Sequence, residues 1–230
     1  MKGYREKFLG MFEDIKSCSK IDIIAINAEI PTCSQNEINF KFGEIEDFLR
    51  YKLDEKLKDC LFLSDEISLY WGYELEEDEY ENGGEFRLSS LSHIFTFSKP
   101  ELWYEEMEEE EKEFYKKLIP FDDHPNTGDG VMGVFKTENG IASPEIWLYD
   151  SNGICHKMDL DYPGYLDHLL ETKGFYGWQY LFCEIDLSDY YFASVQSQLE
   201  TMLKVLPKLF PNNDYKEYFD RYENLNKQNN

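Results

Sequence analysis

The stretch "ISLYWGYEL", residues 67–75, alternates in a way that decides how this chain folds. Ile67, Leu69, Trp71 and Tyr73 place an apolar side chain at every second position, and Leu75 continues the series. Side chains on a β-strand point alternately to the two faces of its sheet. The stretch is therefore expected to form a strand with one buried face.

The residues after this strand predict a turn and a second strand. The segment "EEDEYENGG", residues 76–84, has the charge and the glycines of a turn. A second strand is expected to begin with "EFRLSSL", residues 85–91. Because one loop joins the two strands, we predict an antiparallel pair with a long acidic loop.

Upstream, residues 44–61 predict a helix, because their apolar side chains recur at helical spacing between charged ones. Residues 21–42, "IDIIAINAEIPTCSQNEINFKF", leave strand and helix open, although Pro31 and the polar "SQNE" indicate a break. The apolar residues of the predicted helix are Ile45, Phe48, Leu49, Leu53, Leu57, Cys60 and Leu61.

Downstream, residues 101–118, "ELWYEEMEEEEKEFYKKL", predict a helix with Trp103, Met107, Phe114 and Leu118 on one face. Its eight carboxylates are typical of a solvated helix face. The glycine-bounded "GVMGVF", residues 130–135, is short and apolar, as expected of a strand that is covered on both faces.

The rest of the chain predicts a hairpin and three helices. Residues 145–161 form the hairpin, with Gly153 suited to a positive φ. Residues 162–174, "YPGYLDHLLETKG", form a helix that ends at Gly174. Two C-terminal helices follow, with apolar stripes at Val195, Leu199, Met202 and Leu206, ending at Pro207, and at Tyr215, Phe219, Tyr222 and Leu225.

These elements predict an α+β fold, with helices flanking a mainly antiparallel sheet and extra helices at the C-terminus. At 230 residues the chain is long enough for one large core. We expect a single domain over residues 1–230, with a core at about 40–183 and a C-terminal helical extension at 189–225.

The charge balance limits the classes of partner. Lys plus Arg number 23 and Asp plus Glu number 47, which gives a net charge of −24. This charge repels phosphate backbones and anionic lipids, so we expect no direct binding to nucleic acid or to a membrane. It serves solubility or attraction to a basic protein partner.

The cysteines and the N-terminus indicate a cytoplasmic protein. Five cysteines, with no C-x-x-C pair, favour reduced thiols that mostly fill the core over disulfides or zinc. We expect no signal peptide, because the first 20 residues lack a continuous apolar segment. The cysteines are Cys18, Cys33, Cys60, Cys155 and Cys183.

The loop "PFDDHPNTGDG", residues 120–130, has the composition of a metal or catalytic site. An EF-hand needs acidic or amide ligands at alternate positions before its glycine, and prolines and threonines occupy such positions here. A weaker cation site formed by Asp122, Asp123 and Asp129 remains an alternative. The second interpretation is a turn into the following strand, with aspartates that are solvated or face a partner.

Catalytic motifs are missing elsewhere. No G-x-S-x-G, Walker or dinucleotide motif occurs. The four histidines are scattered, and each is expected to be a surface or hairpin residue rather than a ligand. We therefore expect no enzyme activity, no cofactor and no bound metal. The histidines are His93, His124, His156 and His168.

The order of the motifs resembles the SUKH superfamily of bacterial immunity proteins, which are related to the yeast regulator of cell-wall synthesis. A strand with an aromatic residue precedes a "G-x-F-x-L" strand and a "sleei"-like segment, and an "i-P-F" segment precedes a Gly/Asp turn, an apolar strand, a hairpin and an "f-x-x-y-L" helix. The resemblance spans about residues 40–183. The matching residues are Gly84, Phe86, Leu88, the segment 88–94, Ile119, Pro120, Phe121, Gly128, Asp129, Val131 to Phe135, and the segments 143–153 and 162–170.

The resemblance implies a cytoplasmic protein that binds and neutralises a toxin, often a nuclease or a deaminase, without catalytic residues of its own. Acidic loops would meet a basic toxin surface and exclude its substrate. A regulatory scaffold of the same fold is the alternative, and a metal-dependent enzyme is a third hypothesis. The residues expected to contact the partner are Glu76, Glu77, Asp78, Glu79 and Glu81, followed by Asp122, Asp123 and Asp129.

Overall fold

A computed structural model describes residues 3–60, 65–75, 81–96, 101–138 and 144–227. Within these residues the chain is α+β, with seven strands in a single sheet and helices around it. This confirms the predicted fold class, including the C-terminal helices. The strands are β1 (Ile21–Asn27), β2 (Glu66–Tyr73), β3 (Glu81–Ser89), β4 (Leu118–Asp123), β5 (Met132–Lys136), β6 (Glu145–Tyr149) and β7 (Cys155–Lys157).

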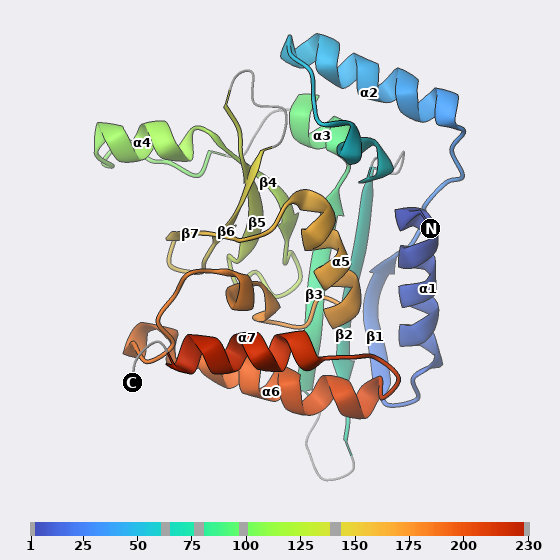
Figure 1. Ribbon diagram of the computed structural model, residues 1–230, viewed down its shortest axis with the longest axis vertical. Coiled ribbons are helices and arrows are strands. Elements are labelled where there is room, and N and C mark those ends of the chain that lie inside the picture. Colours follow the sequence, from blue (N-terminus) through green and yellow to red (C-terminus); the bar gives the residue numbers. More distant parts are fainter. Residues whose placement is uncertain (1–2, 61–64, 76–80, 97–100, 139–143, 228–230) are drawn as a thin grey trace.

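The strands follow one another across the sheet in chain order, and every neighbouring pair is antiparallel. Strands β1 and β7 therefore lie at its two ends (Figure 1). Beyond the short β3–β4 pairing, β3 also pairs with a later segment, through a bridge between Gly84 and Phe175.

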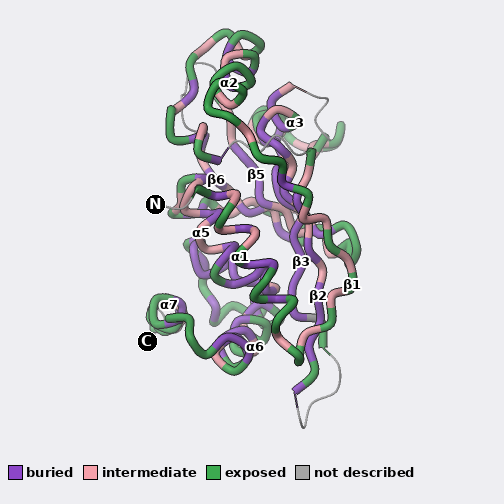
Figure 2. The backbone as a smooth tube through the Cα atoms, turned by 90° about the vertical axis from the view of Figure 1, so that its right-hand side faces the viewer, coloured by how far each residue is buried: buried purple, intermediate pink, exposed green. Residues whose placement is uncertain are grey.

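Helices cover the sheet mainly from one side. Figure 2 shows α1 and α5 on the same side of β1 to β3, with α6 and α7 below them and α2 above. The helices are α1 (Tyr4–Ser17), α2 (Gln35–Leu49), α3 (Leu91–Thr96), α4 (Glu109–Tyr115), α5 (Tyr162–Thr172), α6 (Ala193–Leu209) and α7 (Lys216–Lys227). Three 3-10 helices are η1 (Glu55–Cys60), η2 (Trp178–Phe182) and η3 (Tyr190–Phe192).

The strand that alternates in the sequence is β2, and its apolar residues are buried as predicted. Trp71 is fully buried, and its indole Nε1 donates to the Lys173 carbonyl at 2.8 Å. Strand β3 pairs with β2 antiparallel, as expected, but begins at Glu81 rather than at residue 85. The alternating pattern predicted this strand correctly because only one face of β2 packs against helices.

Strand β5 is covered on both faces, as the run "GVMGVF" predicts. Phe135 is fully buried in the main core, and Val134, which points the opposite way, is fully buried in a second cluster. The hairpin of β6 and β7 and the helix α5 are also confirmed. Gly153 has φ 81°, and α5 ends at Lys173 and Gly174, which both have positive φ.

The helix predicted over residues 44–61 is wrong in its bounds. Helix α2 begins at Gln35, where Ser34 and Glu37 form a capping box, and Arg50 ends it with φ 65°. Residues 55–60 form the separate helix η1. Phe48, predicted to face the core, is 60% exposed.

The helix predicted over residues 101–118 is also too long, because only α4 is helical and Leu118 begins β4. Its apolar residues nevertheless lie together. Leu118 is buried in the second cluster, and Trp103, Met107 and Phe114 pack against that cluster half-buried. The apolar spacing predicted the burial of these residues correctly, but they come from the segment before α4, from α4 itself and from β4 rather than from one helix.

The two C-terminal helices are present, with one difference in each. Helix α6 buries its predicted stripe but continues through Pro207 to Leu209. Helix α7 buries Tyr218 and Leu225, whereas Phe219, predicted to face the core, is 41% exposed.

One core cluster contains residues from α1 at the N-terminus to α7 at the C-terminus. The division into a core at about 40–183 and an extension at 189–225 stays a prediction, and α1 and β1 precede that core range. All five cysteines are free, and two of them, Cys60 and Cys183, are buried. Among the described residues, no helix is both long and apolar enough to cross a membrane.

Candidate partner-binding surface

Asp122, expected to be solvated or to face a partner, is instead part of the core. It lies on β4, is 2% exposed, and accepts hydrogen bonds from the Tyr165 hydroxyl at 2.7 Å and the Arg87 amide at 3.0 Å. Burial raises the pKa of this carboxyl to about 6. The expectation for this residue was therefore wrong, because a side chain this buried cannot meet a partner.

Asp123 and Asp129 are half-exposed, and each already has a partner within the chain. Asp123 binds the Arg87 guanidinium through two hydrogen bonds. Asp129 lies 3.0 Å from His124 Nδ1 and accepts from the Val131 amide at 2.9 Å. The expectation that His124 is a surface or hairpin residue is wrong, because it is 6% exposed. Burial opposes its charged form, but the neighbouring carboxylates, Asp129 first and then Asp122 and Glu85, together raise the pKa of His124.

The buried carboxylate that holds the loop is Glu85, which the sequence did not single out. Glu85 is 1% exposed and accepts hydrogen bonds from the backbone and side chains of Asn126 and Thr127, at 2.6 to 3.0 Å. Gly128 and Gly130 have φ 62° and 80°, which favours glycine. Residues 124–130 thus form a turn into β5 that Glu85 holds in place, which confirms the turn of the second interpretation but not its solvated aspartates.

The three aspartates of this loop engage different partners. Across the described ranges, no group of three or more His, Cys, Asp or Glu side chains is placed to hold a metal ion. The geometry therefore adds no support to the alternative of a cation site.

The two segments expected to bind a partner meet at one cavity. Glu81, at the start of β3, is exposed and lines a cavity of about 340 Å³ together with Thr127 and Asp129. Tyr176 and Gln198 also line it. Glu76, Glu77, Asp78 and Glu79 lie outside the described residues.

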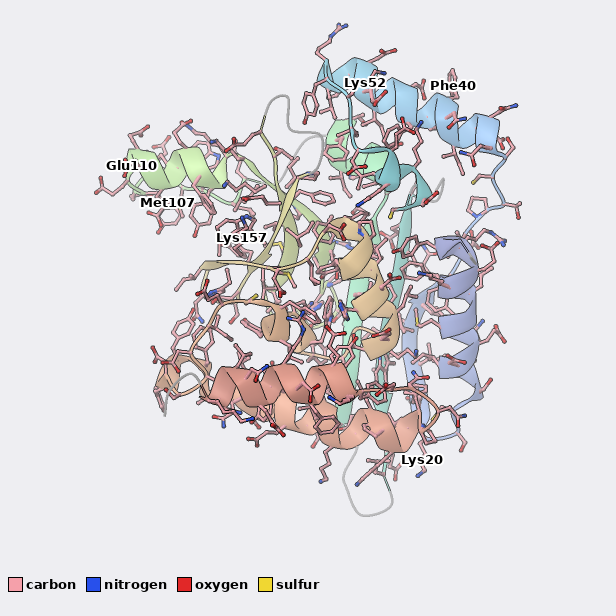
Figure 3. All side chains as sticks on the ribbon, viewed as in Figure 1. Lys20, Phe40, Lys52, Met107, Glu110 and Lys157 are labelled. Carbon is pink, nitrogen blue, oxygen red and sulfur yellow. The ribbon has the colours of Figure 1, made fainter. Side chains whose placement is uncertain are left out.

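A stronger acidic surface lies over residues 104–111, which we call the acidic segment. All six of its glutamates are exposed, and Tyr104 is 59% exposed beside them. Figure 1 shows α4 projecting from the body, and Figure 3 shows Glu110 on its outer side with Met107 below. The sequence signal was the density of glutamates, which we attributed to a solvated helix face.

Few cations neutralise the acidic segment. Lys112 pairs with Glu109 at 3.1 Å, and Lys116 pairs with Glu113 just beyond the segment at 2.6 Å. Within the described part of the chain, the other five glutamates of the segment form no ion pair; they are Glu105, Glu106, Glu108, Glu110 and Glu111. The segment therefore combines unneutralised carboxylates with an exposed aromatic ring.

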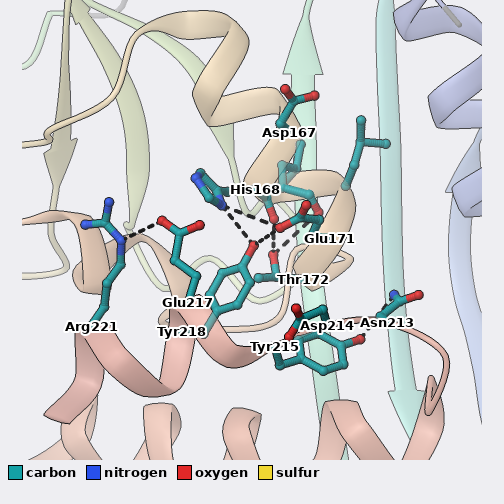
Figure 4. A network of polar contacts seen from close by, with 12 residues as sticks. Asp167, His168, Glu171, Thr172, Asn213, Asp214, Tyr215, Glu217, Tyr218 and Arg221 are labelled. Carbon is teal, nitrogen blue, oxygen red and sulfur yellow. Dashed lines mark hydrogen bonds and ion pairs between the residues drawn. The ribbon is translucent and has the colours of Figure 1, made fainter. Parts of the chain in front are cut away.

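A polar network joins α7 to α5 (Figure 4). The Tyr218 hydroxyl donates to Glu171 Oε2 at 2.6 Å and lies 2.9 Å from His168 Nδ1. The hydrogen bond with His168 lowers the pKa of Glu171, against the effect of burial. Burial and then Glu171 raise the pKa of Tyr218. This network fixes the position of the last helix.

Replacing Tyr218 with phenylalanine is expected to lower the free energy of unfolding by about 1 to 2 kcal/mol, because the hydrogen bond to Glu171 is lost while the ring is kept. Tyr215→Phe is the matched control, since its hydroxyl accepts only a 3.3 Å contact from Asn213. Urea unfolding of the three proteins measures the difference. Equal losses in both variants would show that the hydrogen bond from Tyr218 to Glu171 does not stabilise the packing of α7 against α5.

Comparisons with known proteins identify no relative. No protein-family model matches the chain, no curated protein is similar to it, and no solved structure matches its fold.

Proposed function

We propose that the protein is an immunity protein, which binds a toxin and neutralises it by covering the toxin's functional surface. The order of sequence motifs that resembles the SUKH superfamily supports this proposal. The antiparallel sheet with flanking helices is compatible with it.

The observation that carries the proposal is the acidic segment. Unneutralised carboxylates around Tyr104 suit a basic protein surface, because tyrosine is enriched among the residues that dominate binding energy and the charges raise the association rate. A toxin that acts on nucleic acid needs Lys and Arg to hold phosphates. We therefore propose a nuclease or deaminase toxin, whose phosphate-binding surface the acidic segment occupies.

This binding would take place in the cytoplasm, where a toxin that acts on nucleic acid finds its substrate. The five free cysteines suit a reducing compartment. No residue of the protein needs to react, since covering the surface excludes the toxin's substrate by steric overlap and charge.

Neutralising part of the acidic segment is expected to slow association with the toxin. The triple variant Glu105→Gln, Glu106→Gln, Glu108→Gln should associate about ten-fold more slowly at low salt, because rim charges act mainly on the association rate. The difference should shrink as salt screens the charges. Stopped-flow or surface-plasmon measurements with the toxin encoded next to this protein's gene give the rates.

A matched control changes the net charge equally at a distant place. Glu13→Gln, Asp22→Asn, Glu29→Gln removes three exposed carboxylates of the α1–β1 end, across the molecule from α4 (Figure 1). This control should associate at nearly the wild-type rate. Equal slowing in both triples would mean that net charge, and not the acidic segment, attracts the toxin.

A further inference from the structure

We propose that the cavity between the start of β3 and α6 binds the guanidinium group of an arginine residue in a partner chain. This is the cavity of about 340 Å³ that Glu81, Thr127 and Asp129 line together. Its volume lies at the small end of the range in which proteins hold small ligands. Figure 1 shows α6 and the start of β3 at the lower end of the molecule, whereas α4 lies near the upper end.

The floor of the cavity is aromatic. Tyr73 and Phe175 line it and are each 2% exposed, with ring centres 6.1 Å apart. Tyr176 lies beside them half-buried, and its ring packs at a steep angle against His124, with ring centres 5.5 Å apart. A guanidinium is planar and weakly hydrated and stacks on aromatic rings, whereas an ammonium is compact and strongly hydrated. The floor therefore favours a guanidinium.

The charged side chains that line the cavity are all acidic. Glu81 is exposed and forms no ion pair within the described residues. Asp129 pairs with His124 but keeps about a third of its side chain exposed. In the part of the chain that the structure describes, no lysine, arginine or histidine lines this cavity. Two larger cavities, beside β7 and between α1 and α5, each contain both cationic and acidic side chains. The small cavity thus has negative charge available for a cation from outside.

A buried carboxylate behind the cavity wall is a second reason to expect a cation. Glu85 is 1% exposed and accepts from the Thr127 hydroxyl at 2.8 Å and from the Tyr176 hydroxyl at 3.4 Å. Its other donors, from Asn126 and the Thr127 amide, are also neutral, and no described cation forms an ion pair with it. Buried charges in proteins are usually paired. A cation in the cavity would be separated from Glu85 only by Thr127 and Tyr176 and would offset its charge.

An organic cation fits the cavity better than a metal ion does. No three His, Cys, Asp or Glu side chains of the described ranges are placed to hold a metal. The wall formed by α6 instead adds the hydroxyl groups of Ser197 and Thr201 and the amide of Gln198. Acceptors spread around an opening suit the five N–H donors of a guanidinium.

The walls of the cavity are held in place before any ligand arrives. The Tyr176 amide donates to the Gly83 carbonyl at 3.2 Å, which fixes residues 174–176 to β3. A Cβ at Gly177 would lie 3.2 Å from Gln198 Cβ, so α6 packs closely against this segment. Preformed walls lower the ordering cost of binding.

The charges also indicate that the arginine is part of a chain. Free arginine has an α-carboxylate, which Glu81 and Asp129 would repel and which no cation of the cavity would receive. An arginine residue within a peptide chain lacks this group. This proposal goes beyond the immunity function, since the cavity lies apart from the acidic segment and the test needs no toxin.

The test is a titration of the full-length protein with N-acetyl-arginine amide, followed by backbone amide NMR. N-acetyl-citrulline amide is the matched ligand control, because a neutral ureido group of nearly the same shape replaces the guanidinium. Free arginine distinguishes a free amino acid from a residue in a chain. All titrations are made at one salt concentration, because screening changes every affinity for so acidic a protein.

We expect saturable shifts of the Thr127, Tyr176 and Gln198 amides with N-acetyl-arginine amide, at a Kd of about 1 mM. The citrulline compound should bind about ten-fold more weakly, and free arginine about three-fold more weakly. Shifts located elsewhere, or equal binding of the citrulline compound, would overturn the proposal. Free arginine that binds as tightly as the capped compound would overturn the assignment to a residue in a chain.

Three variants separate the cavity from the general charge of the protein. Glu81→Gln should weaken binding about three-fold. Glu184→Gln makes the same change of net charge at another exposed carboxylate without a described ion pair, and should bind like wild type. Ser197→Phe fills the cavity from an exposed position of α6 and should abolish binding. Circular dichroism and thermal unfolding verify that each variant folds. Equal weakening by both glutamine variants, or undiminished binding to folded Ser197→Phe, would also overturn the proposal.

Discussion

Replacing Gly84 with alanine is expected to lower the free energy of unfolding by about 3 kcal/mol. A Cβ at this position would lie 2.3 Å from the Gly174 carbonyl oxygen and 2.8 Å from the Phe175 Cα. Both are backbone atoms, so no side chain can rotate away. The substitution would separate β3 from residues 174–176, which bond to it through Glu85 and Gly83.

Gly43→Ala is the control for this prediction. A Cβ at Gly43, inside α2, would meet nothing within 4 Å. Alanine there should raise the free energy of unfolding by about 0.5 to 1 kcal/mol through helix propensity. Urea unfolding measures both variants. A loss below about 0.5 kcal/mol in Gly84→Ala would contradict the close packing described here.

Replacing Asp122 with asparagine is expected to remove part of the pH dependence of stability. The folded-state pKa of this carboxyl is raised to about 6 by burial, above the usual value of about 3.9. Folding therefore favours the protonated acid. The stability that this group contributes is full below about pH 4 and is lost as pH rises through 6.

Asparagine stays neutral at every pH and keeps the shape of the side chain. Its oxygen can accept from the Arg87 amide, and its nitrogen can donate to the Tyr165 hydroxyl. Relative to wild type, the variant should gain roughly 2 to 3 kcal/mol between pH 4 and pH 7.5. Urea unfolding across this range measures the gain. If the free energies of unfolding of the two proteins changed equally with pH, the pKa of Asp122 would be the same in the folded and the unfolded protein.

The strands were predictable where the pattern of apolar residues along the sequence matches the faces of the strand that are buried. In β2 one face packs on helices, so apolar residues alternate, and in β5 both faces are covered, so the apolar run is continuous. These patterns act over neighbouring residues, which a sequence displays directly. The glycines that end α5 and turn the hairpin were predictable for the same reason.

Helix bounds were less predictable, because helical spacing can continue beyond a break in the chain. Arg50 takes a left-handed conformation that no local signal required, so α2 ends in the middle of the apolar pattern. Leu118 fits the spacing of the preceding helix but pairs with Lys136 as a strand residue. Tertiary contacts override helical propensity in both places.

The sequence showed which polar residues the loop at 120–130 contains, but it did not show which residues they form hydrogen bonds with. Asp122 meets Tyr165 from 43 positions away, and Glu85 meets Asn126 and Thr127 from 41 and 42 positions away. No spacing rule in the sequence displays such pairs. The acidic segment was visible as a run of glutamates, but the projection of α4, which carries Glu109 to Glu111, required the fold.

The central claim, that the protein neutralises a toxin by binding it, is tested most directly by co-expression with the toxin encoded beside its gene. Growth and co-purification are measured together, with the triple variant of the acidic segment in parallel. We predict that the wild type restores growth and co-purifies with the toxin. Continued toxicity with both proteins folded and expressed, and no complex between them, would contradict the claim.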